Sequence, residues 1–152
     1  MFGLSNQELL VKTIKNACIN ELPQYDTAIK DFLNSANDPN ISDETINKLY
    51  LDARRNYFDA VCCHILNSFS ISSPNIYARF KLAMMNPQMT GLPSEFSSDY
   101  LSSNGISAGA VFAFAYFALT NKKVDTKLFR TMSMLNHYQV DLMNNTLQKY
   151  DK

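Results

Sequence analysis

The longest apolar run of the chain covers residues 108–119 and reads AGAVFAFAYFAL. Because this run has no polar face, a helix formed from it must be covered by other elements on all sides. A helix that crosses a bilayer needs about twenty apolar residues, so the run is too short for a membrane span. We therefore predict a buried central helix at about 108–119, around which the rest of the chain must pack.

Helical patterns continue through nearly all of the remaining sequence. Period-two runs of β-branched residues are absent, and glycine and proline residues fall where helices would start or stop. These patterns predict an all-α fold in which residues 1–152 form a single compact domain of six or seven helices. The residues expected to cap or open helices are Ser5 with Glu8 as a capping box, Pro23, Ser42, Ser73 with Pro74, Ser107, and Val124 with Asp125.

Breaks in these patterns predict the bounds of several elements. A polar loop is expected at 34–41, and the long helix after Ser42 is expected to end near Ser68. Residues 87–105 are the least regular segment, with one short helix expected at about 94–101. The last helix carries apolar residues at helical spacing, which predict its inner face: Leu128, Met132, Leu135, Leu142 and Leu147.

Length, composition and charge exclude several classes of protein. A chain of 152 residues can bury a substantial core without disulfides or a structural metal. Its hydrophobic content of 46% is too high for a disordered chain, and its net charge of zero lacks the basic excess of a general nucleic-acid binder. The N-terminal residues lack the basic region and the unbroken apolar region of a signal peptide, so we expect a cytoplasmic protein.

The cysteines do not form a recognisable framework. There are three, at positions 18, 62 and 63, and an odd count with two neighbours favours reduced thiols over disulfides. Successive helical residues point about 100° apart, so Cys62, Cys63 and His64 cannot ligate one ion together. We interpret this triplet as small buried side chains of a core helix and expect no metal site.

Two further patterns bear on an enzymatic function. His137 and Asp141 are four residues apart, a spacing that suits a metal-ligand pair, a general base or a hydrogen bond on a helix surface. Ser107 lies in the string Gly-Ile-Ser-Ala-Gly, but a nucleophile elbow needs a strand before the serine, and a polar turn precedes it here. We predict a protein without catalytic residues, metal or cofactor. A small helical hydrolase or metal protein using His64, His137 or Asp141 remains an alternative.

The zero net charge divides unequally along the chain. Residues 1–60 hold six Lys or Arg and nine Asp or Glu, whereas residues 61–152 hold eight and five. Acidic groups can steer a basic partner, which suggests a first binding surface made of Asp38, Asp43, Glu44, Asp52 and Asp59. A second candidate surface lies in the irregular segment, where carboxylates stand beside aromatic residues suited to binding hot spots: Glu95, Phe96, Asp99 and Tyr100.

The N-terminal residues resemble those of a known group of proteins. Met1-Phe2-Gly3-Leu4-Ser5, Gln7-Glu8-Leu9 and the stretch at 12–18 resemble the start of small helical immunity proteins of bacterial toxin–immunity systems, contact-dependent growth inhibition in particular. The rest of the chain is similar in size, helicity and asparagine content. The resemblance implies stoichiometric binding to a cognate toxin domain, often a nuclease, whose active site the immunity protein covers in the cytosol. It implies no direct contact with nucleic acid or membrane.

A second class of function is compatible with the same residues. A helical scaffold or regulator that self-associates would also need apolar and charged surfaces without catalytic groups. A gene for a secreted toxin beside the gene for this chain would favour the immunity function, as would a tight equimolar complex with that toxin.

Overall fold

Residues 6–150, the part of the chain that this computed structural model describes, form helices joined by turns and loops, without a strand. The elements are α1 (Asn6–Asn20), α2 (Leu22–Ala36), α3 (Asp43–Ser72), α4 (Pro74–Met85), the 3-10 helix η1 (Pro87–Thr90), α5 (Ser98–Asn104), α6 (Ala108–Thr120) and α7 (Thr126–Gln148). The predicted all-α fold is confirmed, and the described residues form seven α-helices. The first predicted cap, Ser5, lies outside the described residues.

Helix α6 is the central helix that the apolar run predicts. Residues 108–115 are buried, as are Phe117 and Ala118, and the partly exposed residues of the helix are Tyr116, Leu119 and Thr120. The helix packs against α1, α3, α4 and α7. Its small residues let these neighbours approach closely, while its phenylalanines fill the space between them, as in the edge-to-face contact of Phe114 with Phe80.

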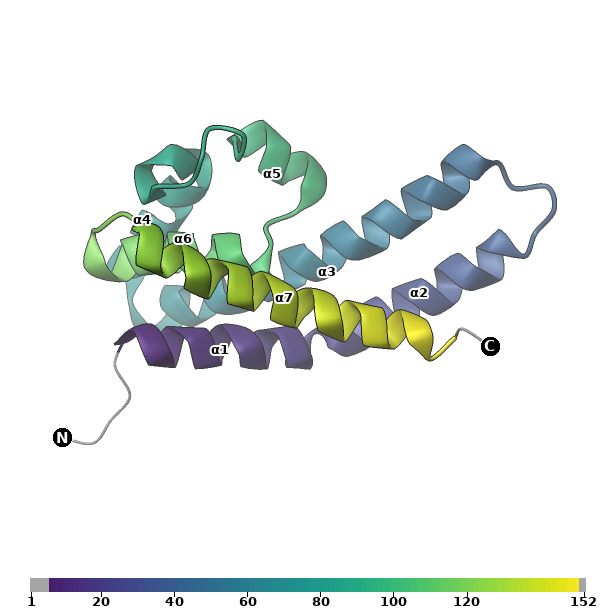
Figure 1. Cartoon of the computed structure of the whole chain (residues 1–152), viewed down its shortest axis with the longest axis horizontal. Coiled ribbons are helices and arrows are strands. Elements are labelled where there is room, and N and C mark those ends of the chain that lie inside the picture. The colour runs from purple at the N-terminus through teal and green to yellow at the C-terminus, as the bar shows by residue number, and fades with distance from the viewer. Residues whose placement is uncertain (1–5, 151–152) are drawn as a thin grey trace.

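The other helices are arranged around α6 in a shape with one long projection. Figure 1 shows α2 and α3 as an antiparallel hairpin whose connecting loop projects at one end of the molecule. Helix α7 runs along α1 and α2, and α5 stands beside α3. The turn between α6 and α7 lies at the end of the molecule opposite the hairpin loop (Figure 1). No helix within residues 6–150 combines the length and the apolar character needed to cross a membrane.

The helix starts follow local capping chemistry. The Thr45 N–H donates to Ser42 Oγ at 3.1 Å, and the Leu128 N–H donates to Asp125 Oδ1 at 2.9 Å. Ser73 is the N-cap residue of α4 by position, but its side chain makes no capping hydrogen bond. Pro23 and Pro74 occupy first-turn positions, where a missing N–H costs nothing. The predicted caps among the described residues are therefore at the expected positions.

Helix α3 is longer than the sequence predicts, ending at Ser72 rather than near Ser68. Serine hydroxyls in its last turns donate to carbonyls of the preceding turn, Ser68 to Ile65 at 2.8 Å and Ser72 to Ser68 at 2.7 Å. Such bonds slightly destabilise a helix and do not by themselves end it, so the helix runs on through these polar residues. The helix ends at Ser72 because Pro74 disfavours helical geometry in Ser73, the residue before it, whose φ is −154°. Helix α2 likewise continues to Ala36, so the predicted loop at 34–41 is shorter than expected.

The inner face of α7 differs in part from the predicted stripe. Leu128, Met132 and Leu135 are buried as expected, whereas Leu142 and Leu147 are half-buried. The buried positions beyond Leu135 are Gln139, Met143 and Thr146. The buried face of α7 therefore keeps its helical spacing but includes two polar residues, Gln139 and Thr146. A search for apolar residues alone does not find them.

Residues at the end of α7 are joined to α2 by a hydrogen bond and an ion pair, which we call the polar clasp of Asp26, Lys149 and Tyr150. The Tyr150 hydroxyl donates to Asp26 Oδ1, and Lys149 Nζ lies 3.2 Å from Asp26 Oδ2. The hydrogen bond from Tyr150, with Lys149 adding to it, holds the pKa of the Asp26 carboxyl below its ordinary value. The same bond raises the pKa of Tyr150 to about 12. The clasp is therefore complete when Asp26 is charged and Tyr150 is neutral.

Replacing Tyr150 by phenylalanine should destabilise the fold more at neutral pH than in acid. A carboxyl whose pKa is depressed on folding stabilises the fold above its unfolded pKa of about 3.9, and this contribution is lost as the pH falls through the folded pKa. We expect Tyr150→Phe to lower the urea midpoint at neutral pH and the difference from wild type to shrink below about pH 3. The control is Tyr116→Phe, because no described residue hydrogen-bonds that hydroxyl. An equal loss at both pH values would contradict the role of Asp26.

Candidate functional site

The irregular segment predicted at 87–105 is held in place by a few side-chain bonds. Gln88 Nε2 donates to the carbonyls of Pro93 at 3.3 Å and Phe96 at 3.0 Å, which fixes the loop between η1 and α5. The Tyr100 N–H donates to Ser97 Oγ at 3.1 Å and starts α5. The short helix therefore lies at 98–104, slightly beyond the predicted 94–101.

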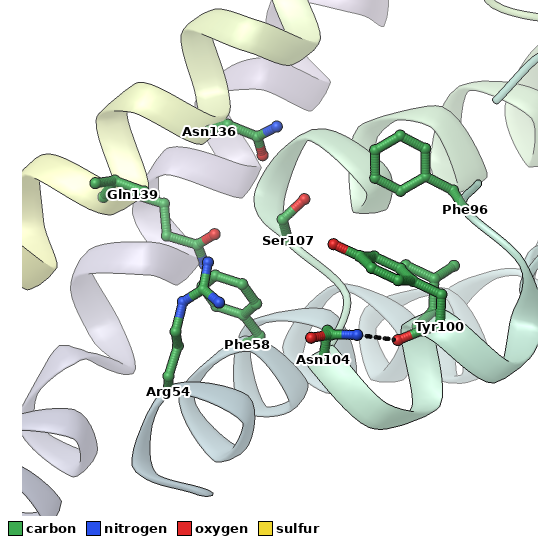
Figure 2. Close-up of a pocket in the computed structure, with 11 residues that line it drawn as sticks. Arg54, Phe58, Phe96, Tyr100, Asn104, Ser107, Asn136 and Gln139 are labelled. Carbon is green, nitrogen blue, oxygen red and sulfur yellow. Dashed lines mark hydrogen bonds between the residues drawn. The ribbon is translucent and has the colours of Figure 1, made fainter. Parts of the chain in front are cut away.

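Gly105 lets the end of α5 lie against α3. Its φ is +85°, which favours glycine, and a Cβ at this position would meet Phe58 Cβ at 3.0 Å and Arg55 Cα at 3.3 Å. A larger residue would push α5 away from α3. Because α5 sits this close, Tyr100 and Asn104 line the same hollow as Phe58 (Figure 2).

A hollow of about 220 Å³ lies where α3, α5 and α7 meet. Its walls come from all three helices and from the N-terminal end of α6, as Figure 2 shows. The aromatic wall consists of Phe58, Phe96 and Tyr100, with Phe96 and Tyr100 in an edge-to-face contact at 5.6 Å between ring centroids. The polar wall consists of Arg54, Asn104, Ser107, Asn136 and Gln139.

Among the described residues that line this hollow, Arg54 alone is charged. Its guanidinium lies over the ring of Phe58 with 4.9 Å between the guanidinium carbon and the ring centroid, a cation–π contact. No carboxylate among residues 6–150 lies within ion-pair distance of Arg54. Its charge is thus uncompensated inside the described chain. Arg54 also lines a neighbouring hollow between α3 and α7, together with Val140 and Met143.

Side chains of α7 cap the N-terminus of α6 beside the hollow. The Ala108 N–H donates to Gln139 Oε1 at 2.9 Å, and the Gly109 N–H donates to Asn136 Oδ1 at 2.7 Å. The Ala110 N–H donates to Ser107 Oγ at 3.4 Å, as predicted for an N-cap serine. The first N–H groups of α6 are therefore already occupied and are not free to hold a ligand.

Gln139 connects this capping cluster to the core. It is fully buried, and its Nε2 makes no hydrogen bond of good geometry with a described residue. Burial raises the pKa of Tyr57, and the nearby amide of Gln139 partly offsets that rise. The Tyr57 hydroxyl itself donates to the Cys18 carbonyl at 2.7 Å. Gln139 thus stands between the hollow and the interface of α1 with α3.

The second predicted binding surface is brought together only in part. Phe96 and Tyr100 line the hollow, and Tyr100 is 45% exposed. Glu95 and Asp99 are exposed and do not line it. The aromatic residues of this segment therefore face a cavity, and its carboxylates lie outside that cavity.

The first predicted surface is divided among three places. Asp38, Asp43 and Glu44 are exposed around the loop of the α2–α3 hairpin. Asp52 lies further along α3 and is paired with Lys48 at 3.1 Å and with Arg55 at 3.2 Å. Asp59 lies near α5 and lines a shallow hollow with Met84 and Leu101.

The environment of Asp59 differs from that of the hairpin carboxylates. Much of the residue is exposed, yet partial burial of its carboxyl raises the pKa of Asp59, and Arg55 offsets part of that rise. We call the exposed residues Asp38, Asp43 and Glu44 the acidic tip. None of these three makes an ion pair with a residue in the described part of the chain.

The acidic and basic residues that are separated along the sequence also lie at opposite ends of the folded molecule. The acidic tip lies at the projecting end of the hairpin in Figure 1. Lysines 122, 123 and 127 and Arg130 are exposed at the α6–α7 turn and the start of α7, at the opposite end. The two charge groups therefore do not neutralise each other by contact.

The alternative enzymatic residues are not gathered into one cluster. Cys18 and Cys62 are buried, Cys63 is exposed and His64 is partly exposed, so the expectation that the side chains of the triplet are buried is confirmed for Cys62 and wrong for Cys63. His137 and Asp141 are both exposed, and no hydrogen bond joins them in the described structure. Within residues 6–150, no three His, Cys, Asp or Glu side chains are grouped to hold a metal.

Sequence reasoning missed Arg54, Phe58, Asn136 and Gln139 as residues of the hollow. They belong to α3 and α7, whose apolar stripes predict core positions but not which polar residues meet across helices. One local signal was present, because Gln139 follows Leu135 by four residues and precedes Met143 by four. A glutamine in the middle of an apolar stripe must find a polar partner, here the end of α6.

Comparisons with protein-family models, with curated proteins and with solved structures found no match to this chain. The resemblance of the N-terminal residues to immunity proteins therefore stays a prediction.

Proposed function

We propose that this chain is an immunity protein that binds a cognate bacterial toxin domain and covers its active site. The observation that supports the proposal best is the acidic tip. Three exposed carboxylates stand on a projecting helical hairpin, and none is neutralised by a cation of the described chain. An enzyme that cleaves nucleic acid needs a basic cleft to hold phosphates, and an acidic projection is complementary to such a cleft.

The test is complex formation with the toxin domain encoded beside the gene for this chain. Co-expression should give a tight equimolar complex on size-exclusion chromatography, and it should restore growth to cells that produce the toxin domain. Light scattering of the chain alone separates this from the scaffold alternative, which predicts a stable oligomer that the toxin does not change. If the two proteins elute separately and growth is not restored, the proposed function is wrong.

Reversing one charge of the acidic tip should slow association with the toxin domain. We expect Asp43→Lys to lower the association rate about tenfold at low salt and to flatten its dependence on ionic strength, because steering acts on the encounter. Stopped-flow or biolayer kinetics measure both quantities. Asp141→Lys on α7 is the matched control, since Asp141 is also exposed but lies outside the tip. If the two variants associate at the same rate, the acidic tip does not face the partner.

The same substitution must leave the fold intact for this result to count. Asp43 lies in the first turn of α3, where the interaction of a negative charge with the helix dipole stabilises the helix by about 0.3–1 kcal/mol. The Ser42 cap remains in the variant. A small fall in thermal stability with unchanged helical content is therefore expected, and it would not account for a tenfold slower association.

A further inference from the structure

We propose that the hollow between α3, α5 and α7 binds a carboxylate that is carried next to an aromatic or apolar group. The proposal goes beyond toxin neutralisation and does not depend on it, because it rests on the chemistry of the hollow alone. This site is also separate from the acidic tip, which attracts ligands of the opposite charge.

The polar wall of the hollow offers hydrogen-bond donors. Asn136 uses its oxygen for the Gly109 N–H, which leaves both hydrogens of its Nδ2 to donate. Ser107 Oγ accepts from Ala110, so its own proton is free to donate. The Tyr100 hydroxyl points toward Ser107 in Figure 2 and has no partner among the described residues. A carboxylate accepts hydrogen bonds and donates none, so it matches this set.

The positive charge of Arg54 in the hollow also favours a carboxylate ligand. Arg54 contributes a guanidinium whose planar fork matches a carboxylate, and no acidic side chain lines the hollow to compete for it. Its contact with Phe58 holds the guanidinium at the edge of the aromatic wall. A ligand carboxylate there would gain a charge-assisted bond that the chain itself does not supply.

The size and the aromatic wall define the rest of the ligand. A cavity of about 150 Å³ holds a benzene ring, so the volume of about 220 Å³ has room for a ring with a carboxylate. The rings of Tyr100 and Phe96, which both line the hollow, offer aromatic contacts to such a ring. A free aromatic acid and a glutamate side chain beside an aromatic residue of a partner protein share this chemistry.

The test uses phenylacetate and its neutral counterpart phenylacetamide, titrated into the labelled full chain and followed by NMR. Phenylacetate should bind with a dissociation constant on the order of millimolar, the range set by its few atoms. It should shift the signals of the Arg54 Nε–H and the Asn136 side-chain amide. Phenylacetamide should bind about tenfold more weakly, because it lacks the charge that Arg54 recognises. Equal binding of the two compounds, or no saturable shift with phenylacetate, would overturn the proposal.

Variants of Arg54 locate the site and separate the effect of its charge from the effect of its packing. Arg54→Met retains the aliphatic stem and should weaken phenylacetate binding about tenfold. Arg54→Lys keeps the positive charge and should retain part of the affinity for phenylacetate. Arg130→Met, on the exposed surface of α7, is the control and should change nothing. If Arg130→Met weakened binding as much as Arg54→Met, phenylacetate would be responding to overall charge and the proposal would fail.

A second titration distinguishes the two sources of the carboxylate. The probe is a dipeptide of phenylalanine and glutamate, acetylated at its N-terminus and amidated at its C-terminus. Tighter binding of this peptide than of phenylacetate assigns the hollow to an acidic segment of a protein, whereas tighter binding of phenylacetate assigns it to a free acid. Failure of toxin binding would leave both titrations interpretable, so the two proposals are tested separately.

Discussion

Replacing Ala113 by aspartate should unfold the protein or come close to it. Ala113 lies in the middle of α6 with no solvent exposure, and α6 is covered by α1, α3, α4 and α7. An unpaired charge in such a place costs about 3–5 kcal/mol, a large part of the 5–15 kcal/mol that typically stabilises a domain. Circular dichroism during thermal and urea unfolding would measure the loss.

Two companion variants show whether the charge is the cause. Ala113→Asn has nearly the same size without the charge, so it should retain more stability than Ala113→Asp at neutral pH. Ala78→Asp places the same charge on the exposed surface of α4 and should unfold much as the wild type does. If Ala113→Asp had the melting temperature of the wild type, the central position of α6 would be wrong.

Replacing Gly109 by alanine should destabilise the protein, although the same change in an open helix stabilises it by about 1 kcal/mol. A Cβ at this position would stand 2.7 Å from the Met132 carbonyl oxygen and 2.8 Å from the side-chain amide of Asn136. The start of α6 would have to move away from α7 and give up its hydrogen bonds to Asn136 and Gln139. We expect a net loss of about 2–4 kcal/mol, combining overpacking with unsatisfied buried groups.

A double-mutant cycle with Asn136→Ala tests the stated cause. Asn136→Ala alone removes a cap and should cost about 0.5–2 kcal/mol. Because both changes disrupt the same contact, the double variant should lose less than the sum of the two single losses. Strictly additive losses, or a Gly109→Ala variant more stable than wild type, would contradict the close approach of α6 and α7.

The parts of the fold that the sequence predicts are those governed by local chemistry. The run at 108–119 predicts a buried helix because it has no polar side to expose. Ser42, Ser107 and Asp125 predict helix starts because an N-cap needs only its own side chain and an N–H two or three residues ahead. The end of α3 lies four residues beyond the predicted one, because serines that bond to the preceding turn resemble helix breakers in a pattern of apolar residues.

The candidate site was predicted less well, because its residues meet only after the helices pack. Phe96 and Tyr100 were selected as aromatic residues of an irregular segment, and they do line the hollow. Arg54 and Asn136 are separated in sequence by most of the fold, and nothing in their neighbours indicates that they face each other. The acidic residues were grouped by their positions along the chain, whereas turns of α3 distribute Asp43, Asp52 and Asp59 over different surroundings.

The central position of α6 has a consequence for how the chain is made. Helices α1, α3 and α4 all pack against α6, yet they are synthesised before it. At about 5–20 residues per second, the roughly fifty residues between the ends of α3 and α6 take on the order of 2–10 seconds to add. During that time the apolar surface that α6 covers on the earlier helices lacks its partner, and transiently exposed apolar surface favours aggregation. The central helix is thus synthesised after most of the helices that cover it.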